Sequence, residues 1–291
     1  MSDLRENRLS GAEMIEKIVV VIVTALGIGR LADPWRRRYF QWVIASTPDK
    51  GLAHVGLYLG HVILIAAMLL YAWAVKRDRP YFTGMFRGSP RRNALYGVLG
   101  ALTGLALMGI CIFAASAHGD IVIRASSDVQ TPLLLLALPV VLIQASTEEV
   151  ESRGFLFGRM KSEGIPVMLA AGISAFYFAY IHLNNDGFGI LPLLSIFVVG
   201  FQFALSCHYF GTIWFACGMH TLWNYTQDFI FGLPDSGNPA AVSIFNTTVN
   251  GSSFFYNRTF GIEGSAMAIL VNLIGCGVIF LVGRRILDRR R

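Results

Sequence analysis

The chain has 291 residues, of which 54% are apolar, 12% are aromatic and only 14% are charged. Soluble domains carry about a quarter charged residues, so this composition excludes an ordinary soluble protein, and it equally excludes a disordered, collagen-like or coiled-coil chain. The 24 Lys and Arg residues outnumber the 18 Asp and Glu residues. They cluster between apolar runs, as expected of loops beside lipid headgroups rather than of a nucleic-acid surface. The sequence therefore predicts an all-α, multi-pass integral protein of the cell membrane.

About eight apolar segments are expected to cross the membrane as helices around a polar cavity, because roughly 20 apolar residues cover the hydrocarbon core. In chain order they are residues 18–29, 51–75, 94–116, 131–147, 165–183, two segments within 187–227, and 264–283. The first segment is short and spans only if the charged residues beside it extend to the interface. Gly97, Gly100 and Gly104 place small residues at helical spacing, which favours close packing of the third span against another helix.

The basic residues favour an orientation with both termini in the cytoplasm. In that orientation the inner segments hold 17 Lys and Arg residues and the outer loops hold 7, and cytoplasmic loops are the basic ones in membrane proteins. The run Arg36, Arg37 and Arg38 is the exception, because it falls in the first outer loop. We expect one membrane domain, in which residues 1–130 form N-terminal spans without specific motifs and residues 131–291 form the functional core.

Three polar clusters lie in or beside the predicted spans, at residues 148–153, 178–182 and 220–224. An Asp, Lys or Arg at the centre of an inserted helix costs at least about 2.5–3.5 kcal/mol, so such residues indicate a functional site. Glu149 and Arg153 are four positions apart and are expected to form a helix-stabilising ion pair. Glu148 points about 100° away from Glu149 and has no cation four positions ahead, which leaves its carboxylate free for chemistry.

Chain folding is expected to bring Glu148 and His182 to one depth. Glu148 lies 17 positions before residue 165 and His182 lies 17 positions after it, so two helical arms joined by a turn there place both residues about 25 Å from the turn. His220 and Asn224, four positions apart, leave the same face of the seventh span. The other histidines have no partner at a useful spacing and are expected to be packing or interfacial residues: His54, His61, His118 and His208.

Two chemistries fit these residues. A carboxylate and a neutral imidazole can hold and deprotonate a water molecule as general bases. A second histidine and an amide can then donate hydrogen bonds to the oxyanion that forms when this water attacks a carbonyl. Two histidines with one or two glutamates can also bind zinc, although the HExxH arrangement is absent. The residues alone leave both versions open.

The three motifs together resemble those of the CPBP ("Abi") family of intramembrane proteases. The family includes relatives of the Ras-converting CAAX endopeptidases, which remove the last three residues of prenylated proteins. The motifs are EExxxR followed by Gly at 148–154, FxxxH at 178–182 and HxxxN at 220–224, and they occur in this order over about residues 144–224. The string FGIEG at 260–264 also resembles a feature of bacterial members.

The resemblance implies an intramembrane endopeptidase core at residues 131–291 that acts on a peptide or membrane-protein substrate in the lipid bilayer. It also implies a glutamate-dependent reaction without a metal or other cofactor, so that zinc is disfavoured. The residues it implies are Glu148 and His182 for activation of water, His220 and Asn224 for the oxyanion site, and Glu149 and Arg153 in support.

Two other classes of function fit the residues less well. A non-catalytic scaffold or bacteriocin-immunity protein of the same fold does not require an acid, a base and oxyanion donors together, and all of these residues are intact here. A proton-coupled transporter could use Glu148 and His182 as a relay, but the two halves of the chain do not resemble an inverted repeat. The endopeptidase is therefore the favoured interpretation.

Overall fold

The fold is described from a computed structural model, which describes residues 9–86 and 88–288. The long helices are α1 (Gly11–Ser46), α5 (Pro90–His118), α6 (Thr131–Glu149), α9 (Ile190–Phe210) and α11 (Ala266–Asp288). The shorter ones are α2 (Lys50–Leu59), α3 (His61–Ala74), α4 (Arg79–Thr83), α7 (Gly158–Ser162), α8 (Val167–Tyr180) and α10 (Trp214–Tyr225). Two π-helical segments, Val150–Phe157 and Thr226–Ile230, directly follow α6 and α10. Two strands, β1 (Ile121–Ala125) and β2 (Phe245–Val249), pair antiparallel.

The chain is an all-α, polytopic membrane protein, as predicted. Within the described residues, five helical stretches are long and apolar enough to cross a membrane: Lys50–Ala74, Pro90–His118, Thr131–Ser162, Ile190–Phe210 and Ala266–Ile286. A shorter apolar helix covers Val167–Tyr180. The remaining predicted spans coincide with parts of α1 and α10, which are helical. The count of eight crossings therefore stays a prediction.

The first helix is much longer than the sequence analysis expected. Ser10 caps its first turn, since the Ser10 hydroxyl accepts from the Glu13 amide while the Glu13 carboxylate accepts from the Ser10 amide. The helix then continues to Ser46, beyond which Thr47 adopts extended geometry before Pro48. Arg36, Arg37 and Arg38 thus lie inside a helix, and the expectation of an outer loop at these residues is wrong.

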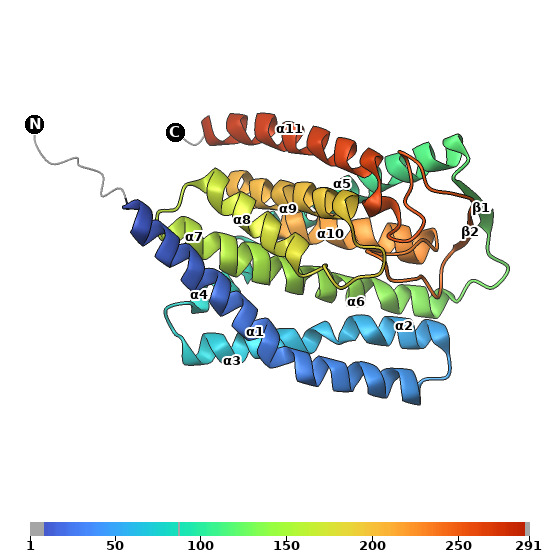
Figure 1. The fold of residues 1–291 in the computed structure, drawn as a ribbon, viewed down its shortest axis with the longest axis horizontal. Helices are drawn as coiled ribbons and strands as arrows, with labels where there is room; N and C mark the ends of the chain where they lie inside the picture. Colours follow the sequence, from blue (N-terminus) through green and yellow to red (C-terminus); the bar gives the residue numbers. More distant parts are fainter. Residues whose placement is uncertain (1–8, 87, 289–291) are drawn as a thin grey trace, which may run out of the picture.

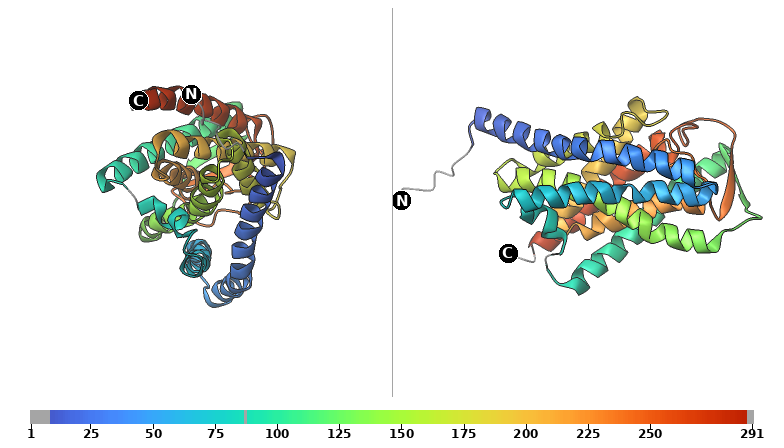
Figure 2. Two further views of the ribbon diagram at one scale, coloured as in Figure 1. Left: turned by 90° about the vertical axis from the view of Figure 1, so that its left-hand side faces the viewer. Right: turned by 90° about the horizontal axis from the view of Figure 1, so that it is seen from below.

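The helices form an elongated bundle (Figure 1). The start of α1 and the end of α11 lie at one end of it, and the β1–β2 ribbon lies at the other end. Both Figure 1 and Figure 2 show α11 on the side opposite α2 and α3, with α6, α8, α9 and α10 between them. The polar motifs all belong to these inner elements, to the π-helical segment that follows α6 or to the turn after α8.

Glycines allow α5 and α10 to approach each other closely. A Cβ atom at Gly100 would lie 2.0 Å from the Phe215 carbonyl oxygen, and one at Gly104 would lie 2.1 Å from the Met219 carbonyl oxygen. Such separations are possible only for residues without a side chain, so the predicted role of these glycines in close packing is confirmed. The contact fixes the helix that carries His220.

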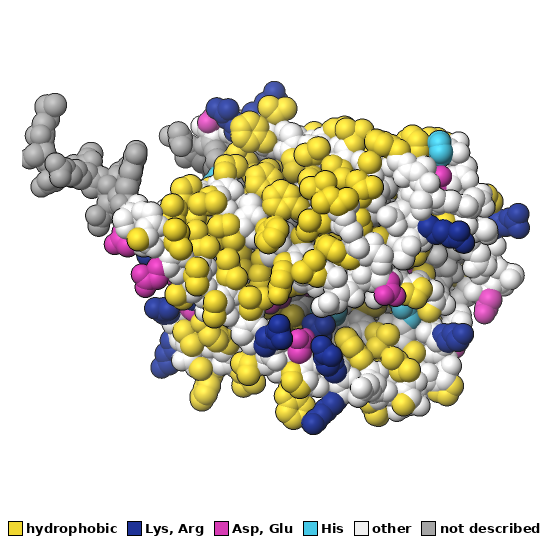
Figure 3. Space-filling model, viewed as in Figure 1, with side chains coloured by type: hydrophobic (Ala, Val, Ile, Leu, Met, Phe, Trp, Pro, Cys, Tyr) yellow, Lys and Arg dark blue, Asp and Glu magenta, His cyan; other side chains and the backbone are white. Residues whose placement is uncertain are grey.

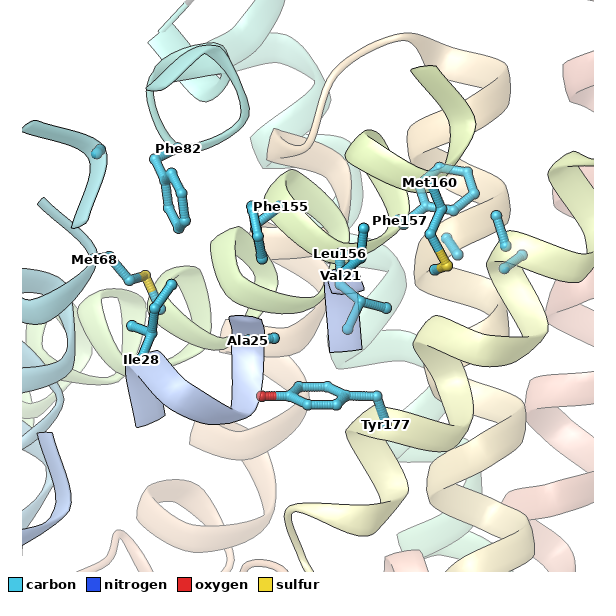
Figure 4. Close-up of a cluster of buried hydrophobic side chains, with 14 of the residues drawn as sticks. Val21, Ala25, Ile28, Met68, Phe82, Phe155, Leu156, Phe157, Met160 and Tyr177 are labelled. Carbon is cyan, nitrogen blue, oxygen red and sulfur yellow. The ribbon is translucent and has the colours of Figure 1, made fainter. Parts of the chain in front are cut away.

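The N-terminal half of α1 packs into the largest apolar cluster of the protein (Figure 4). Val21, Ala25 and Ile28 are buried there, and Tyr177 of α8 extends toward this part of α1 (Figure 4). The Tyr177 hydroxyl donates to the Glu151 carboxylate over 2.8 Å. From Leu26 onward, another face of the same helix lines a cavity.

Candidate active site

A cavity of about 690 Å³ reaches into the bundle from one face. Figure 3 shows a hollow on this face, with basic and acidic side chains beside it on an otherwise largely apolar surface. Its wall contains all four residues to which the sequence analysis assigned chemistry: Glu148, His182, His220 and Asn224. They come from α6, from the turn after α8 and from α10. Chain folding thus collects them around one space.

The hydrogen bonds around Glu148 allow only one assignment of donors and acceptors. A carboxylate only accepts, so the Gln144 Nε2 atom must donate to Glu148 Oε1, over 2.8 Å. Gln144 Oε1 is then an acceptor, and Asn224 must present its Nδ2 atom to it, over 3.3 Å. An amide nitrogen carries two protons, so the second N–H of Asn224 stays available. Glu148 Oε2 is buried and makes no hydrogen bond with the described residues.

Gln144 was missed as a contact residue of the site. It stands four positions before Glu148, so both side chains leave one face of α6. The same spacing rule that pairs Glu149 with Arg153 could therefore have found it. Its amide links the carboxylate of Glu148 to Asn224, which lies 80 positions away in the chain.

His220 lies between the two neighbouring glutamates. Its Nδ1 atom is 3.0 Å from Glu149 Oε1, and its Nε2 atom is 3.8 Å from Glu148 Oε2. The ring stacks on Phe203 with a centroid separation of 5.3 Å. Because Glu149 accepts from Nδ1, the opposite nitrogen is directed at Glu148 and the cavity, and a ring protonated on both nitrogens can donate in both directions.

The predicted ion pair between Glu149 and Arg153 is confirmed. Arg153 donates to Glu149 Oε1 over 3.0 Å, and both side chains are fully buried. The guanidinium also donates to the Gly200 carbonyl over 3.0 Å and lies 4.2 Å above the ring of Phe178. A buried charge must be paired and hydrogen-bonded to be tolerated, so Arg153 and Glu149 stabilise each other in place behind His220.

His182 lies in the turn directly after α8. Its Nδ1 atom is 2.7 Å from the Phe178 carbonyl oxygen, and a carbonyl only accepts, so Nδ1 carries the proton. The Nε2 atom then has a lone pair. His182 makes no ion pair with Glu148, and both residues line the cavity. The pair can therefore act together only through a molecule that lies between them.

His118 Nδ1 lies 3.2 Å from the buried Asp120 Oδ2. Two histidines that line the cavity also approach buried carboxylates, so the expectation that these three only pack is wrong. His61 Nε2 lies 3.3 Å from Glu148 Oε1, and His54 Nε2 lies 2.7 Å from Asp228 Oδ2. The two histidines are seven positions apart, which is two helical turns, so they share a face of one apolar span. The seven-residue spacing of His54 and His61 is the feature of the sequence that could have indicated this. Glu148 is therefore flanked by His61 and His220.

The outer wall of the cavity is acidic. Tyr58 lies 2.8 Å from Asp228 Oδ2 and 2.6 Å from Asp235 Oδ2, and one hydroxyl proton can serve only one of these carboxylates. The second contact therefore requires a protonated carboxyl. Burial, together with the neighbouring carboxylates of Glu263 and Asp228, raises the pKa of Asp235 well above its ordinary value of 3.8, so Asp235 is the carboxyl that holds this proton.

Both helices that carry the predicted site residues, α6 and α10, are followed directly by a change in geometry. The segment Val150–Phe157 follows Glu149, and Thr226–Ile230 follows Tyr225, and both are π-helical. Turns of this kind are rare and frequently lie at functional sites. Sequence reasoning assumed regular α-helices here and missed both.

The described residues contain no group of three or more His, Cys, Asp and Glu side chains arranged to hold a metal ion. Structural and catalytic zinc sites need three or four such ligands at coordination distance. Asn224, which shares a helix face with His220, offers only an amide, and its nitrogen is directed at Gln144.

Residues 130–226 match the family model described as type II CAAX prenyl endopeptidase, Rce1-like. The matched segment begins at α6 and ends with α10, so it contains all three motifs and confirms the resemblance drawn from them. It indicates a peptidase of the CAAX-protease type, with peptide substrates, in an integral membrane protein. No curated protein matches the chain.

Proposed function

We propose that this protein is an intramembrane endopeptidase in which Glu148 and His182 activate the water that hydrolyses a peptide bond. The observation that carries the proposal is the state of the Glu148 carboxylate. One of its oxygens accepts from Gln144, while the other is buried and has no hydrogen-bond partner in the part of the chain that the structure describes. His182 lines the same cavity, and its free Nε2 atom completes a pair of bases.

The reaction follows from the donors and acceptors. Water between Glu148 and His182 loses a proton to one of these bases, and the hydroxide adds to the carbonyl carbon of the scissile bond. The carbonyl oxygen becomes an oxyanion, which accepts from the free N–H of Asn224 and from His220. When the carbon–nitrogen bond breaks, the base returns its proton to the leaving amine. Atoms and charges balance without a further reactant.

Glu149 and Arg153 act as positioning residues in this scheme. Glu149 accepts from His220 Nδ1 over 3.0 Å, which orients the ring so that Nε2 points at the oxyanion. Arg153 neutralises Glu149, so that the buried site does not hold two uncompensated carboxylates. Neither residue touches the substrate.

The proposed reaction uses no metal ion. Glu148 accepts from Gln144, and the Asn224 Nδ2 atom donates to Gln144 with one of its two protons. An amide oxygen is a poor zinc ligand beside carboxylate and imidazole, whereas an amide N–H is a good oxyanion donor. The chemistry of the donor set thus supports water activation by side chains.

The test compares three glutamate-to-glutamine variants of the purified full chain in lipid nanodiscs. Glu148→Gln removes the base and keeps the shape, so peptide cleavage should fall by at least about 10²–10⁴-fold. Glu149→Gln should reduce the rate less, through misorientation of His220. Glu163→Gln alters a carboxylate that pairs with Arg159, which does not line the cavity, and should keep the parent's rate.

The readout is the appearance of new C-terminal fragments, from S-prenylated and unmodified peptides and from membrane proteins of the native cell. The same sample is assayed after exhaustive chelation, with its metal content measured. Processing by Glu148→Gln at the parent's rate would favour the non-catalytic scaffold. A tightly bound zinc whose removal silences the protein and whose return restores it would contradict the metal-free reaction.

A further inference from the structure

The string FGIEG at residues 260–264 has no part in the proposed reaction, yet its glutamate lies at the cavity. Glu263 belongs to a short 3-10 helix just before α11, lines the cavity and is only 8% exposed. Phe260 is fully buried and packs against Phe188, in the segment after α8, with the ring centroids 6.2 Å apart. Its carbonyl accepts from the Gly237 amide over 3.1 Å. The string therefore contacts both the segment after α8 and the loop that precedes β2.

The Glu263 carboxylate joins α10 to the loop that precedes β2. Its Oε1 atom accepts from the Trp223 indole N–H over 2.7 Å, and its Oε2 atom accepts from the Ser236 hydroxyl. Trp223 is 2% exposed and directly precedes Asn224 in α10. One carboxylate therefore holds both this loop and the helix that carries the proposed oxyanion donors.

The loop in turn holds the turn that carries His182. The Ser236 carbonyl accepts from the Asn185 side-chain amide over 2.9 Å, and the Asn185 backbone amide donates to the His182 carbonyl over 3.0 Å. The next residue of the loop, Gly237, passes so close that a Cβ atom there would lie 2.2 Å from the Asp186 carbonyl oxygen. Hydrogen bonds and close packing thus connect this turn with the loop.

The backbone of Ser236 indicates that the loop is held in one arrangement. Ser236 has a φ of +48°, and within residues 9–86 and 88–288 it is the one non-glycine residue with a left-handed φ. Such a conformation persists only where surrounding contacts over-determine it, and it is concentrated at functional sites. The contacts that do so here are those of the Ser236 hydroxyl with Glu263 and of its carbonyl with Asn185.

We infer that Glu263 is a positioning residue of the active site, which fixes the distance between the His182 turn and the Asn224 end of α10. The inference rests on the proposed endopeptidase function, in which water is activated beside His182 and the oxyanion forms beside Asn224. Both groups must meet one peptide bond, and a misplacement of about 1 Å can lower a rate about 100-fold. Glu263 acts on the two groups through Ser236 and Trp223.

Two substitutions of Glu263 separate positioning from a direct effect of its charge. A glutamine can accept from the Trp223 indole with its oxygen and donate to the Ser236 hydroxyl oxygen with its nitrogen. Glu263→Gln thus keeps both contacts and loses the charge, whereas Glu263→Ala loses both contacts. A carboxylate that acts on the substrate through its charge would fail in both variants, but a positioning residue is rescued by glutamine.

Asp120, directly before β1, provides a matched control. It is 7% exposed, and its carboxylate accepts from the Ser253 hydroxyl in the loop after β2. Asp120 does not line the cavity. Asp120→Ala therefore removes a buried carboxylate that holds a loop, and it leaves the contacts between Glu263 and the His182 turn in place.

The first measurement is hydrogen–deuterium exchange of the full chain in phosphatidylcholine nanodiscs, which needs no turnover. The amides of residues 182, 183, 185 and 188 each donate to the carbonyl three positions earlier, so their exchange reports how often the turn opens. Glu263→Ala and Ser236→Ala should raise this exchange about 10–100-fold, as expected for the loss of a hydrogen bond to a charged group. Glu263→Gln and Asp120→Ala should keep the parent's rate.

The second measurement is peptide cleavage by the same samples. Glu263→Ala should lower kcat about 10–100-fold with KM unchanged, and Glu263→Gln should restore it. Unchanged exchange in Glu263→Ala, a glutamine variant as slow as the alanine variant, or a loss confined to KM would overturn the inference. So would faster exchange throughout the chain, because Glu263 would then stabilise the fold as a whole. A parent that cleaves nothing would contradict the proposed function, and the exchange of the alanine and glutamine variants would still decide whether Glu263 holds the turn.

Discussion

Replacing Gly104 with alanine tests how closely α5 positions α10, the helix to which we assign the oxyanion donors. The new Cβ atom would lie 2.1 Å from the carbonyl oxygen of Met219, the residue directly before His220. Ordinary contact begins at 3.4 Å, so the two backbones must separate by about 1.3 Å, the difference between these distances. A misplacement of about 1 Å at a reacting group can lower the rate about 100-fold.

The expected change in stability is smaller than the change in rate. Overpacking costs about 1–3 kcal/mol, and the gain of about 1 kcal/mol in helix propensity from Gly to Ala offsets part of it. We therefore expect the Gly104→Ala variant to fold, with a lower melting temperature and a peptide-cleavage rate about 100-fold below that of the parent. The cleavage rate is measured in nanodiscs with saturating peptide.

The matched control lies on the same helix. A Cβ atom at Gly109 would have nothing within 4 Å, so Gly109→Ala should keep the rate and keep or raise the melting temperature. Equal rates for Gly104→Ala, Gly109→Ala and the parent would refute the reasoning, because α10 would then have moved without consequence for His220 or would not pack on α5 as described.

Two further predictions concern single side chains of the cavity wall. Asn224→Ala should lower turnover by about 10²–10³-fold with little effect on peptide affinity, and Asn224→Asp should lower it further, since a carboxylate repels the developing oxyanion; a raised KM with unchanged kcat would contradict the role. The raised pKa of Asp235 means that the folded state keeps a proton which the unfolded state releases above pH 3.8. This contribution to stability is complete below that pH and is lost as the pH rises through the folded-state pKa. Asp235→Asn is neutral at every pH. The melting temperature of this variant minus that of the parent should therefore increase as the pH rises from about 4 to 8. A difference in melting temperature that does not change with pH would disprove the assignment.

Features that depend on spacing within one helix were predictable from the sequence. The ion pair of Glu149 with Arg153 and the glycine contacts of α5 both follow from the helical repeat. The membrane class followed from composition, and the family resemblance from three short motifs in order. The catalytic roles of Glu148, His182, His220 and Asn224 stay predictions until variants are measured.

Features that depend on tertiary pairing could not be predicted. His61 and Glu148 are 87 positions apart, and no spacing rule connects two different helices. The reading of Arg36, Arg37 and Arg38 as a loop failed for a different reason. A hydropathy argument treats a charged residue as a sign of the aqueous phase, but Arg36 and Arg37 line a polar cavity of the bundle and Arg38 is exposed on the same continuous helix.

Each π-helical segment interrupts the regular α-helical repeat of the helix that contains it, so that the side-chain positions before and after the segment follow different registers. A π-turn accommodates one residue more than an α-turn, because its hydrogen bonds run from i to i+5. The faces before Val150–Phe157 and Thr226–Ile230 are thus rotated relative to the faces after them. Deleting one residue inside either segment would remove the extra residue and restore a continuous α-helix. The downstream packing face would then keep its orientation, and so would Glu148 and Asn224, which lie upstream. The chemistry-bearing half and the packing half of each helix can therefore accept insertions and substitutions separately.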